Sequence, residues 1–313
     1  MRLKLKKDWN NNMNKFKSGF VSIVGRTNVG KSSLLNTLAK QKVAVVVNKP
    51  QTTRTTIKAI VNRENSQIIF VDTPGIHKPK SKLSDVMNEN AWSSISDADI
   101  VLFVVEATSN EIGKGDRLIL DKIKEVGVPT ILIINKIDLV TREEIIKLIE
   151  NFKDEYDFKA IIPISAIKTK DAKVILEEIE KNLNEGPAYY NIEEYTDQTL
   201  RDISSEIVRE KALKLLRDEI PHGIFVEIEK LKKSKNMQNK PFFNIEATIY
   251  CTKESHKGII IGKNGEMLKK IGIYARQDLE KELGEQVNLK LWVKVREDWI
   301  NDEKFLKKFK FEK

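Results

Sequence analysis

A glycine-rich loop between an apolar run and a helical pattern constrains the fold of this chain more than any other feature. Residues 25–32 are Gly-Arg-Thr-Asn-Val-Gly-Lys-Ser, which matches G-x-x-x-x-G-K-S/T. The apolar run 20–24 precedes the motif, and the helical pattern 33–38 follows it. In a strand–loop–helix unit of this kind, backbone N–H groups surround a phosphate at a helix N-terminus. The motif therefore predicts a phosphate-binding loop in an α/β fold.

The side chains at the end of this loop have predicted roles of their own. Lys31 would contact the β- and γ-phosphate oxygens, and the Ser32 hydroxyl would bind Mg²⁺. The predicted phosphate-binding residues are Gly25, Arg26, Thr27, Asn28, Val29, Gly30, Lys31 and Ser32.

A second motif, D-T-P-G at 72–75, closes another apolar strand. We expect Asp72 to hold Mg²⁺ through water and the Gly75 N–H to contact the γ-phosphate. Alone, the motif would also fit an ordinary β-turn with proline at its second position. A threonine between the two motifs would complete the Mg²⁺ shell, and we favour Thr53, with Thr52 as the alternative. The predicted switch residues are Thr52, Thr53, Asp72, Thr73, Pro74, Gly75 and Ile76.

The N-K-I-D sequence at 135–138 follows the apolar run 131–134 and predicts a guanine site. The Asp138 carboxylate can accept hydrogen bonds from guanine N1–H and N2–H₂. Adenine offers neither donor, so it would leave a buried carboxylate unpaired, which is costly. Asn135 would brace the base and the phosphate loop, and Lys136 would lie along the ring.

A two-residue motif completes the predicted guanine site. Ser165 and Ala166 follow the strand predicted at 160–164, where the Ala166 N–H would contact guanine O6. The order of all five motifs along the chain makes a chance match improbable.

Between residues 20 and 183, apolar strands alternate with amphipathic helices, which predicts a doubly wound α/β sheet with ligands at the carboxyl ends of the strands. The pair 57–61 and 68–71 predicts one antiparallel hairpin in an otherwise parallel sheet. Predicted strands are 20–24, 57–61, 68–71, 99–105, 129–134 and 160–164, and predicted helices are 32–39, 82–96, 115–126, 142–155 and 171–182.

We predict two domains from the 313 residues. Residues 1–17 form an extension, predicted to be disordered, in which either Met1 or Met13 starts the chain. Residues 18–183 form the first domain, 184–200 a linker packed by its tyrosines, 201–296 a smaller α+β domain, and 297–313 a basic helix or tail. In the second domain we expect a helix at 200–219, strands at 223–231 and 242–252, a glycine turn, a helix at 266–283 and a strand at 286–295.

The net charge of +9, with Lys and Arg increasing toward the C-terminus, favours an anionic partner, either nucleic acid or an acidic membrane surface. A generally lysine-rich composition is the alternative. The single cysteine, Cys251, excludes an internal disulfide and is expected in the core of a strand, which fits a cytoplasmic chain. No apolar run approaches the length of a membrane span. The three histidines show no metal-ligand spacing and are interpreted as loop residues.

The second domain contains a G-x-x-G loop, Gly262-Lys263-Asn264-Gly265, before the helix predicted at 266–283. Such a loop clamps a single-stranded RNA backbone, because side chains must be absent where the phosphates approach. An ordinary glycine-rich connection is the alternative.

The last predicted strand adds a second possible RNA contact. Lys290, Trp292, Lys294 and Arg296 alternate with apolar residues and would share one exposed face, which suits nucleic acid or simply a soluble sheet surface. The Phe/Lys tail 304–313 would be a solvated helix end or a contact to RNA or anionic lipid.

Taken with these motifs, the chain resembles the Era family of bacterial GTPases that act in small ribosomal subunit assembly. The segments that carry the resemblance are 25–32, 50–54, 72–76, 135–138, 185–190, 209–211, 219–222, 261–265 and 290–295. The resemblance implies a GTPase domain joined to a type II KH domain. It implies binding of GTP or GDP with Mg²⁺, and binding of the 3′ end of small-subunit ribosomal RNA and the 30S-type subunit. It also implies a monomeric, cytoplasmic protein, with a peripheral membrane fraction in some members.

Two residues bear on the hydrolysis rate. Ile76 stands where many GTPases have a water-orienting glutamine, so we expect slow intrinsic turnover. Asn28 occupies a position that in related GTPases helps to bind K⁺ between the phosphates. The alternative interpretation is that Asn28 is simply a turn residue of the loop.

Two other classes of function are alternatives to an RNA-binding assembly factor. A membrane-surface GTPase would use the basic tail as its main contact. An ATP-driven RNA remodeller conflicts with the prediction that Asp138 recognises guanine and rejects adenine.

Overall fold

The computed structural model describes residues 16–47, 49, 52–109, 111–167, 170–217, 220–235 and 237–308. The chain divides into two compact units, one made mainly of residues before Gln198 and one mainly of Gln198–Phe309, with Val45–Lys49 assigned to the second. Each unit is described by itself. The predicted N-terminal extension up to residue 15, the choice between Met1 and Met13, and Pro50 and Gln51 lie outside the described residues.

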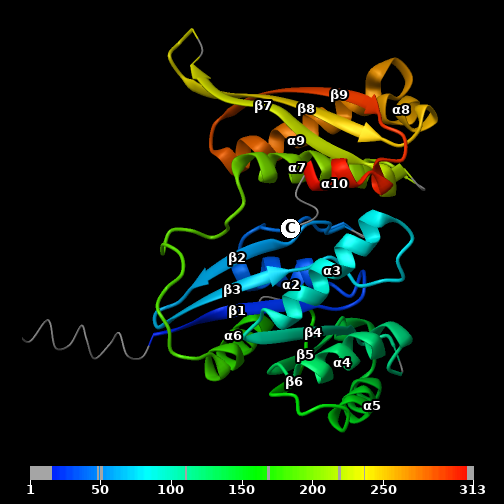
Figure 1. The fold of residues 1–313 in the computed structure, drawn as a ribbon. Helices are drawn as coiled ribbons and strands as arrows, with labels where there is room; N and C mark the ends of the chain where they lie inside the picture. Colours follow the sequence, from blue (N-terminus) through cyan, green and yellow to red (C-terminus); the bar gives the residue numbers. More distant parts are fainter. Residues whose placement is uncertain are drawn as a thin grey trace, which may run out of the picture. The chain divides into compact units, whose positions relative to one another are not determined.

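The first unit is a six-stranded sheet in the order β2-β3-β1-β4-β5-β6 (Figure 1). All neighbouring strands are parallel except β2 and β3, which form the predicted antiparallel hairpin. The strands are β1 Lys17–Val24, β2 Ile57–Asn62, β3 Ser66–Asp72, β4 Ile100–Glu106, β5 Thr130–Asn135 and β6 Ala160–Pro163. Because β1 begins at Lys17, it starts inside the span that we had assigned to the extension.

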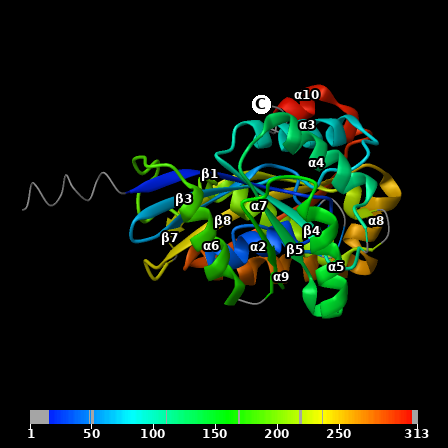
Figure 2. The same cartoon turned by 90° about the horizontal axis from the view of Figure 1, so that it is seen from below.

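Helices cover both faces of this sheet, and the helices α2 Lys31–Ala39 and α6 Lys170–Asn182 lie on the opposite side from α3 Lys82–Ser96 and α4 Lys114–Val126 (Figure 2). Helix α5 Arg142–Lys153 packs on the same side as α3 and α4. The central strands are apolar on both faces, as parallel sheets require. The prediction of a doubly wound α/β unit is therefore confirmed.

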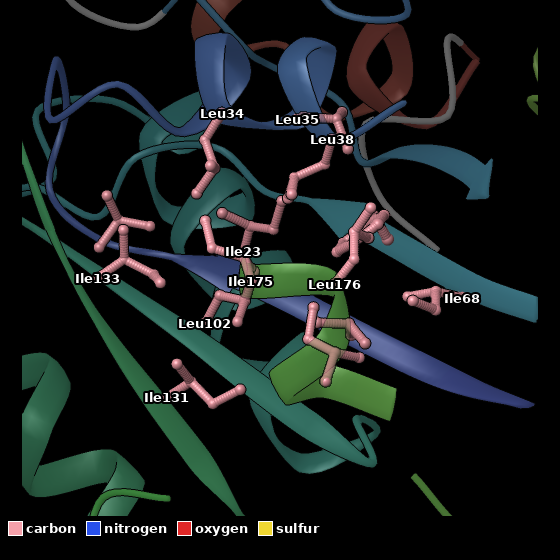
Figure 3. Close-up of a cluster of buried hydrophobic side chains, with 14 of the residues drawn as sticks. Ile23, Leu34, Leu35, Leu38, Ile68, Leu102, Ile131, Ile133, Ile175 and Leu176 are labelled. Carbon is pink, nitrogen blue, oxygen red and sulfur yellow. The ribbon is translucent and has the colours of Figure 1, made fainter. Parts of the chain in front are cut away.

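The side chains between the sheet and α2/α6 form one continuous core. Ile23, Leu102 and Ile133 project from three neighbouring strands toward Leu34 and Leu35 of α2 (Figure 3). Helix α6 adds Ile175 and Leu176 to the same cluster. This packing holds α2, and with it the loop that precedes α2, against the carboxyl end of β1.

The segment 184–200, predicted as an interdomain linker, is hydrogen-bonded to the first unit over much of its length. It runs along the outer edge of β2, where the Ile60 N–H donates to the Tyr195 carbonyl at 2.9 Å and the Thr196 hydroxyl donates to the Lys58 carbonyl at 2.7 Å. The Tyr189 ring packs on Phe20 at 5.1 Å between centroids. The segment thus covers the open edge of a strand that would otherwise expose unpaired backbone groups.

The second unit is a three-stranded sheet in the order β7-β8-β9, with β7 antiparallel and β9 parallel to the central strand β8. Its strands are β7 Phe225–Lys235, β8 Pro241–Cys251 and β9 Gln286–Val295. Its helices are α7 Leu200–Leu215, α8 Glu254–Ile261, α9 Glu266–Leu283 and α10 Glu303–Lys308. Ile271, Ala275 and Leu279 of α9, spaced four residues apart, face the core, and Cys251 is buried as predicted.

The second unit differs from the prediction in several places. Helix α7 ends at Leu215, before the predicted residue 219, and β7 runs to Lys235, beyond the predicted residue 231. Residues 254–261 form helix α8, where we expected a glycine turn. Three consecutive isoleucines at 259–261 favour a strand by propensity, but only Ile260 is buried and Ile259 is 52% exposed, as on a helix with one packed face. His256 consequently lies in this helix and not in a loop.

The described part of the C-terminal tail also packs into the second unit. Phe305 and Leu306 of α10 are buried, and the Phe305 ring lies 5.3 Å from that of Phe225. Trp299 is fully buried and its indole N–H donates to the Gly223 carbonyl at 3.0 Å. This part of the tail is therefore not the solvated helix end that we considered.

Candidate nucleotide and RNA sites

The predicted phosphate loop lies between the end of β1 and the start of α2. Within it, Gly30 packs against the side chain of Asn135. Gly30 has φ +101°, and a Cβ atom there would lie 2.2 Å from Nδ2 of Asn135. The Lys31 ammonium donates to the carbonyls of Gly25 at 3.0 Å and Arg26 at 2.8 Å. The loop therefore has room for no side chain at Gly30, and the Lys31 ammonium group is hydrogen-bonded to two carbonyls of the loop itself.

Lys31 is nearly inaccessible to solvent, and burial lowers its pKa to about 8, although the nearby Asp72 carboxylate opposes this shift. In this conformation its partners are neutral carbonyl oxygens. Anionic phosphate oxygens would be stronger acceptors for the same ammonium group.

The three side chains predicted to surround Mg²⁺ lie together. The Ser32 hydroxyl is 2.8 Å from Oδ2 of Asp72 and 2.8 Å from the Thr53 hydroxyl. Thr53 is itself 3.3 Å from the same carboxylate oxygen. Thr53, the threonine that we favoured, thus lies beside Ser32 and Asp72.

Asp72 has one carboxylate oxygen without a hydrogen-bond partner among the described residues, Oδ1, although its side chain is fully buried. Burial raises the pKa of Asp72 to about 6, with Lys31 and the two hydroxyls opposing the shift. A buried, unsatisfied carboxylate oxygen beside two hydroxyls is an arrangement that fits a small divalent cation with oxygen ligands. The residues present therefore fit Mg²⁺.

The segment after β3 packs directly on the phosphate loop. A Cβ atom at Gly75 would lie 2.7 Å from Cα of Thr27, so only glycine allows this approach. The Ile76 N–H donates to the Gly25 carbonyl at 3.3 Å, and the Ile76 side chain is buried in the core beneath. The Thr73 hydroxyl donates to the Ile23 carbonyl at 3.0 Å, and Pro74 is buried.

Asn135 links the predicted guanine loop to the phosphate loop. Its amide donates to the Val29 carbonyl at 2.7 Å and accepts from the Ala166 N–H at 2.9 Å. Ser165 beside it is buried. Three of the predicted motifs thus meet at one buried side chain.

The remaining residues of the N-K-I-D motif are more accessible. Lys136 has φ +66° and pairs with Glu106 at 2.8 Å, and Asp138 is exposed in the 3₁₀ turn Ile137–Leu139. Burial alone would raise the pKa of Glu106, but hydrogen bonds from Lys136 and Thr108 lower it below its ordinary value. The ammonium group of Lys136 is thereby held by Glu106.

An ion pair behind the phosphate loop was missed in the sequence. Nε of Arg26 donates to Oδ1 of the buried Asp116 at 2.9 Å, and Nη2 donates to the Ser109 hydroxyl at 3.2 Å. A Cβ atom at Gly115 would lie 2.7 Å from Cδ of Arg26. The first turn of α4 therefore holds a phosphate-loop side chain, and no sequence pattern links residues 26 and 116.

In the second unit the G-x-x-G loop joins α8 to α9 by a sharp turn. Gly262 has φ +74°, and a Cβ atom there would lie 2.7 Å from Cβ of Met267. Gly265 has φ +77° with open space around it, and the side chains of Lys263 and Asn264 between them are exposed. The loop thus presents a bare backbone and a cation to solvent, which is the arrangement of a phosphate clamp.

The second predicted RNA surface, the outer face of β9, has mixed charge. Lys294 pairs with Glu229 at 2.9 Å, and Lys290 lies opposite Glu246 in the register. Arg296 pairs with Asp302 at 2.6 Å and stacks on Phe305, and Trp292 is 41% exposed. Glu227 and Glu229 in β7 and Glu246 in β8 are visible in the sequence, and these acidic residues in the neighbouring strands are the signal that this face is not uniformly basic.

The fold and these sites define a class of protein, a P-loop GTPase unit joined to a KH unit. The family described as "50S ribosome-binding GTPase" matches residues 20–136, and the KH domain family matches residues 219–300. Among the described residues, no helix is both long enough and apolar enough to cross a membrane.

Individual relatives extend over nearly the whole chain. The chain is 54% identical to GTPase Era of Caldanaerobacter subterraneus subsp. tengcongensis over 94% of this chain and 97% of that protein. A crystal structure of Era in complex with MgGDPNP and nucleotides 1506–1542 of 16S ribosomal RNA matches with a TM-score of 0.90 and 39% identity, covering 95% and 100% of the two chains. A single-residue variant of Aquifex aeolicus Era bound to GDP·AlF4⁻ gives a TM-score of 0.90 at 40% identity, covering 95% of this chain and 100% of that one. The chain belongs to the Era family of GTPases.

Proposed function

We propose that this GTPase is a nucleotide-switched assembly factor of the small ribosomal subunit that binds the 3′ end region of the small-subunit ribosomal RNA. The observation that carries the proposal is the presence, in one chain, of a GTP site built on Asn135 and a bare G-x-x-G loop. An Era relative bound to nucleotides 1506–1542 of 16S ribosomal RNA supports the choice of RNA.

In the first unit we assign each predicted nucleotide residue its role. Backbone N–H groups of residues 25–32 and the Lys31 ammonium bind the phosphates, while Ser32, Thr53 and, through water, Asp72 hold Mg²⁺. Bound Mg²⁺ would neutralise charge on the phosphates. Asp138 reads guanine, with Lys136 along the ring and Ala166 N–H at O6.

We further infer that hydrolysis is slow and is stimulated by K⁺. Ile76 is buried and apolar, so it cannot orient a water molecule by hydrogen bonding. Asn28 has φ +65° in the phosphate loop, which is also a conformation expected for a turn residue. Phosphate release measured in matched KCl and NaCl distinguishes the two interpretations, because equal rates would leave Asn28 as a turn residue.

RNA binding is assigned to Gly262, Lys263, Asn264 and Gly265, and its test uses charge reversal without a backbone change. The double variant Lys263→Asp/Asn264→Asp should lose most affinity for single-stranded RNA from the 3′ end of small-subunit ribosomal RNA. GTP turnover should persist, because the nucleotide motifs lie in the other unit. Gel shift and phosphate release measure the two activities.

A matched control, Gln277→Asp/Lys281→Asp, makes the same change in charge at two exposed positions within helix α9, away from the loop that precedes this helix. This control should keep its RNA affinity. Undiminished RNA binding by the loop variant, with its circular dichroism unchanged, would contradict the assignment and make Lys290, Trp292 and Lys294 the next candidates.

Nothing in the described part of the chain favours a membrane-surface role, because the tail residues Phe305 and Leu306 are buried in the second unit. Cytoplasmic location and a monomeric state remain predictions.

A further inference from the structure

Helix α2 is hydrogen-bonded to the loop that carries the predicted guanine contact. The Thr37 hydroxyl donates to the Ala166 carbonyl at 2.5 Å, although the two residues are 129 positions apart in the sequence. A threonine inside a helix commonly gives its hydroxyl proton to a carbonyl of the preceding turn. Here that proton is given to the loop after β6, so the Thr37 side chain ties α2 to this loop.

Hydrophobic packing brings the two partners together. Leu34 and Leu38 of α2 face the sheet, and Thr37 is half-buried at the border of this apolar stripe (Figure 3). Ala166 belongs to the same buried cluster as these leucines. A carbonyl of a buried residue needs a donor from the protein itself, and Thr37 supplies that donor.

The backbone of Ala166 is thereby held on both sides of its Cα atom. Its N–H donates to Oδ1 of Asn135 at 2.9 Å, and its carbonyl accepts from the Thr37 hydroxyl. The two bonds hold two successive peptide groups. Ala166 therefore cannot rotate in the loop without weakening at least one of these bonds.

This restraint bears on base recognition, because the N–H that Asn135 accepts is the one assigned to guanine O6. A bound guanine must share this N–H with Asn135 or replace Asn135 as its acceptor. A hydrogen bond weakens steeply as its angle at the hydrogen decreases, so a rotation of Ala166 would reduce its bond to the base. The Thr37 bond opposes such a rotation before any nucleotide is bound.

We propose that Thr37 is a positioning residue for guanine recognition, which holds the Ala166 N–H where it meets O6 of the base. The inference rests on the proposed nucleotide site and adds to it a determinant from α2. Thr37 acts through Ala166 and not by touching the base. Its contribution is separate from that of Asp138, which is assigned to N1–H and the C2 amino group.

The test uses two analogues that each change one edge of the base. In 6-thioguanosine diphosphate, sulfur replaces O6 and is a weaker acceptor, while N1–H and the amino group remain. Inosine diphosphate keeps O6 and lacks the amino group. Competition against a fluorescent GDP analogue near neutral pH gives the affinities. Wild type should bind the thio analogue about tenfold more weakly than GDP, because a buried N–H is left with a poor acceptor.

The central variant is Thr37→Val, which keeps the β-branched shape and removes the hydroxyl. Its preference for GDP over the thio analogue should fall from about tenfold to about two- to threefold. Its preference for GDP over inosine diphosphate should stay at the wild-type value. Thr37→Ser keeps the hydroxyl and should keep the wild-type ratios. Thr37→Ala favours the helix and should repeat the result of valine without any change in packing that valine brings.

A matched control, Thr130→Val, removes a bond of the same kind in the same unit. The Thr130 hydroxyl donates to the Val128 carbonyl at 2.8 Å, and its side chain is buried. Thr130 begins β5 and Asn135 ends it, so the control lies at the opposite end of the strand from the guanine loop. Both of its ratios should equal those of wild type, even where its melting temperature falls as far as that of Thr37→Val.

The outcomes separate this inference from the proposed nucleotide site. A wild-type thio ratio in both Thr37→Val and Thr37→Ala would show that Thr37 does not position Ala166, while the proposed site would stand. An equal decrease of the thio ratio in Thr37→Ser or Thr130→Val would also overturn the inference, since the Thr37 hydroxyl would not be its cause. If wild type binds GDP and the thio analogue equally, the assignment of Ala166 to O6 fails as well.

Discussion

The phosphate loop and the G-x-x-G loop are both glycine-rich turns before a helix, yet their surroundings are opposite. Gly30 is enclosed by Asn135, and Lys31 is buried against loop carbonyls. Gly265 has open space around it, and Lys263 and Asn264 are exposed. Residues from distant parts of the chain hold the first loop in its conformation. The second loop presents an uncovered backbone turn and a positive charge to solvent. We therefore expect abrupt effects of substitution at the first and graded effects at the second.

The largest expected effect concerns the choice of base at Asp138. Asp138→Asn should lower GDP affinity on the order of 10⁴-fold, because sites built to hydrogen-bond a substrate group discriminate by this much. Xanthosine diphosphate should bind instead, since its C2 oxygen accepts from the new amide. Competition against a fluorescent GDP analogue measures both affinities, and unchanged GDP binding would show that Asp138 does not read the base.

A matched pair of alanine substitutions tests the contrast between the two loops directly. Gly30→Ala places a methyl group 2.2 Å from Nδ2 of Asn135, so the phosphate loop must open and nucleotide affinity should fall at least about 100-fold. Gly265→Ala meets no atom and costs only the strain of a positive φ, about 1 kcal/mol. It should lower RNA affinity by less than about tenfold. Equal losses in the two variants would remove the distinction that we draw.

A smaller effect is expected at Asp116, which holds Arg26 behind the phosphate loop. Asp116→Asn keeps an oxygen for Nε of Arg26 but removes the charge, so GDP should dissociate about three- to tenfold faster. Asp121→Asn, an exposed position on the same helix, is the control. Stopped-flow displacement of fluorescent GDP gives the rates.

The pH dependence adds a second measurement for the same pair. Burial raises the pKa of Asp116, and Arg26 opposes that shift, so this carboxylate gains a proton at a higher pH than an exposed one. Acidification should therefore speed GDP release more in wild type than in the Asn variant, which has no charge to lose. Parallel pH profiles would mean that the charge on Asp116 does not position the loop.

The smallest effect is expected at the C-terminal segment of the second unit. A hydrogen bond from Arg296, and to a smaller extent one from the Phe305 N–H, lowers the pKa of Asp302 below its ordinary value. Because the pKa is lowered in the folded chain, the contribution to stability is present above about pH 4 and is lost as the pH falls below it. Hydrogen exchange at the Trp299 indole should accelerate in this window, and Asp302→Asn should abolish the pH dependence. A flat profile in wild type would contradict the role of this ion pair.

The alternation of strands and helices in the first unit was predictable because hydrophobic periodicity is a local property. The bounds of α3 and α9 and the start of α5 agree with those expected from their apolar spacing. The helix α8 was not predictable in the same way, since Ile259, Ile260 and Ile261 favour a strand until the packing of Ile260 alone is known.

The sequence by itself determined the order and spacing of the nucleotide motifs and of the G-x-x-G loop, because each motif is a run of neighbours along one turn. Only the tertiary structure decided that Thr53 lies beside Ser32 and Asp72, that Arg26 meets Asp116, and that Glu229 faces Lys294. These pairs are 19 to 90 residues apart. Their meeting depends on strand order, register and helix packing, which are set by burial over the whole unit and leave no local pattern in the chain.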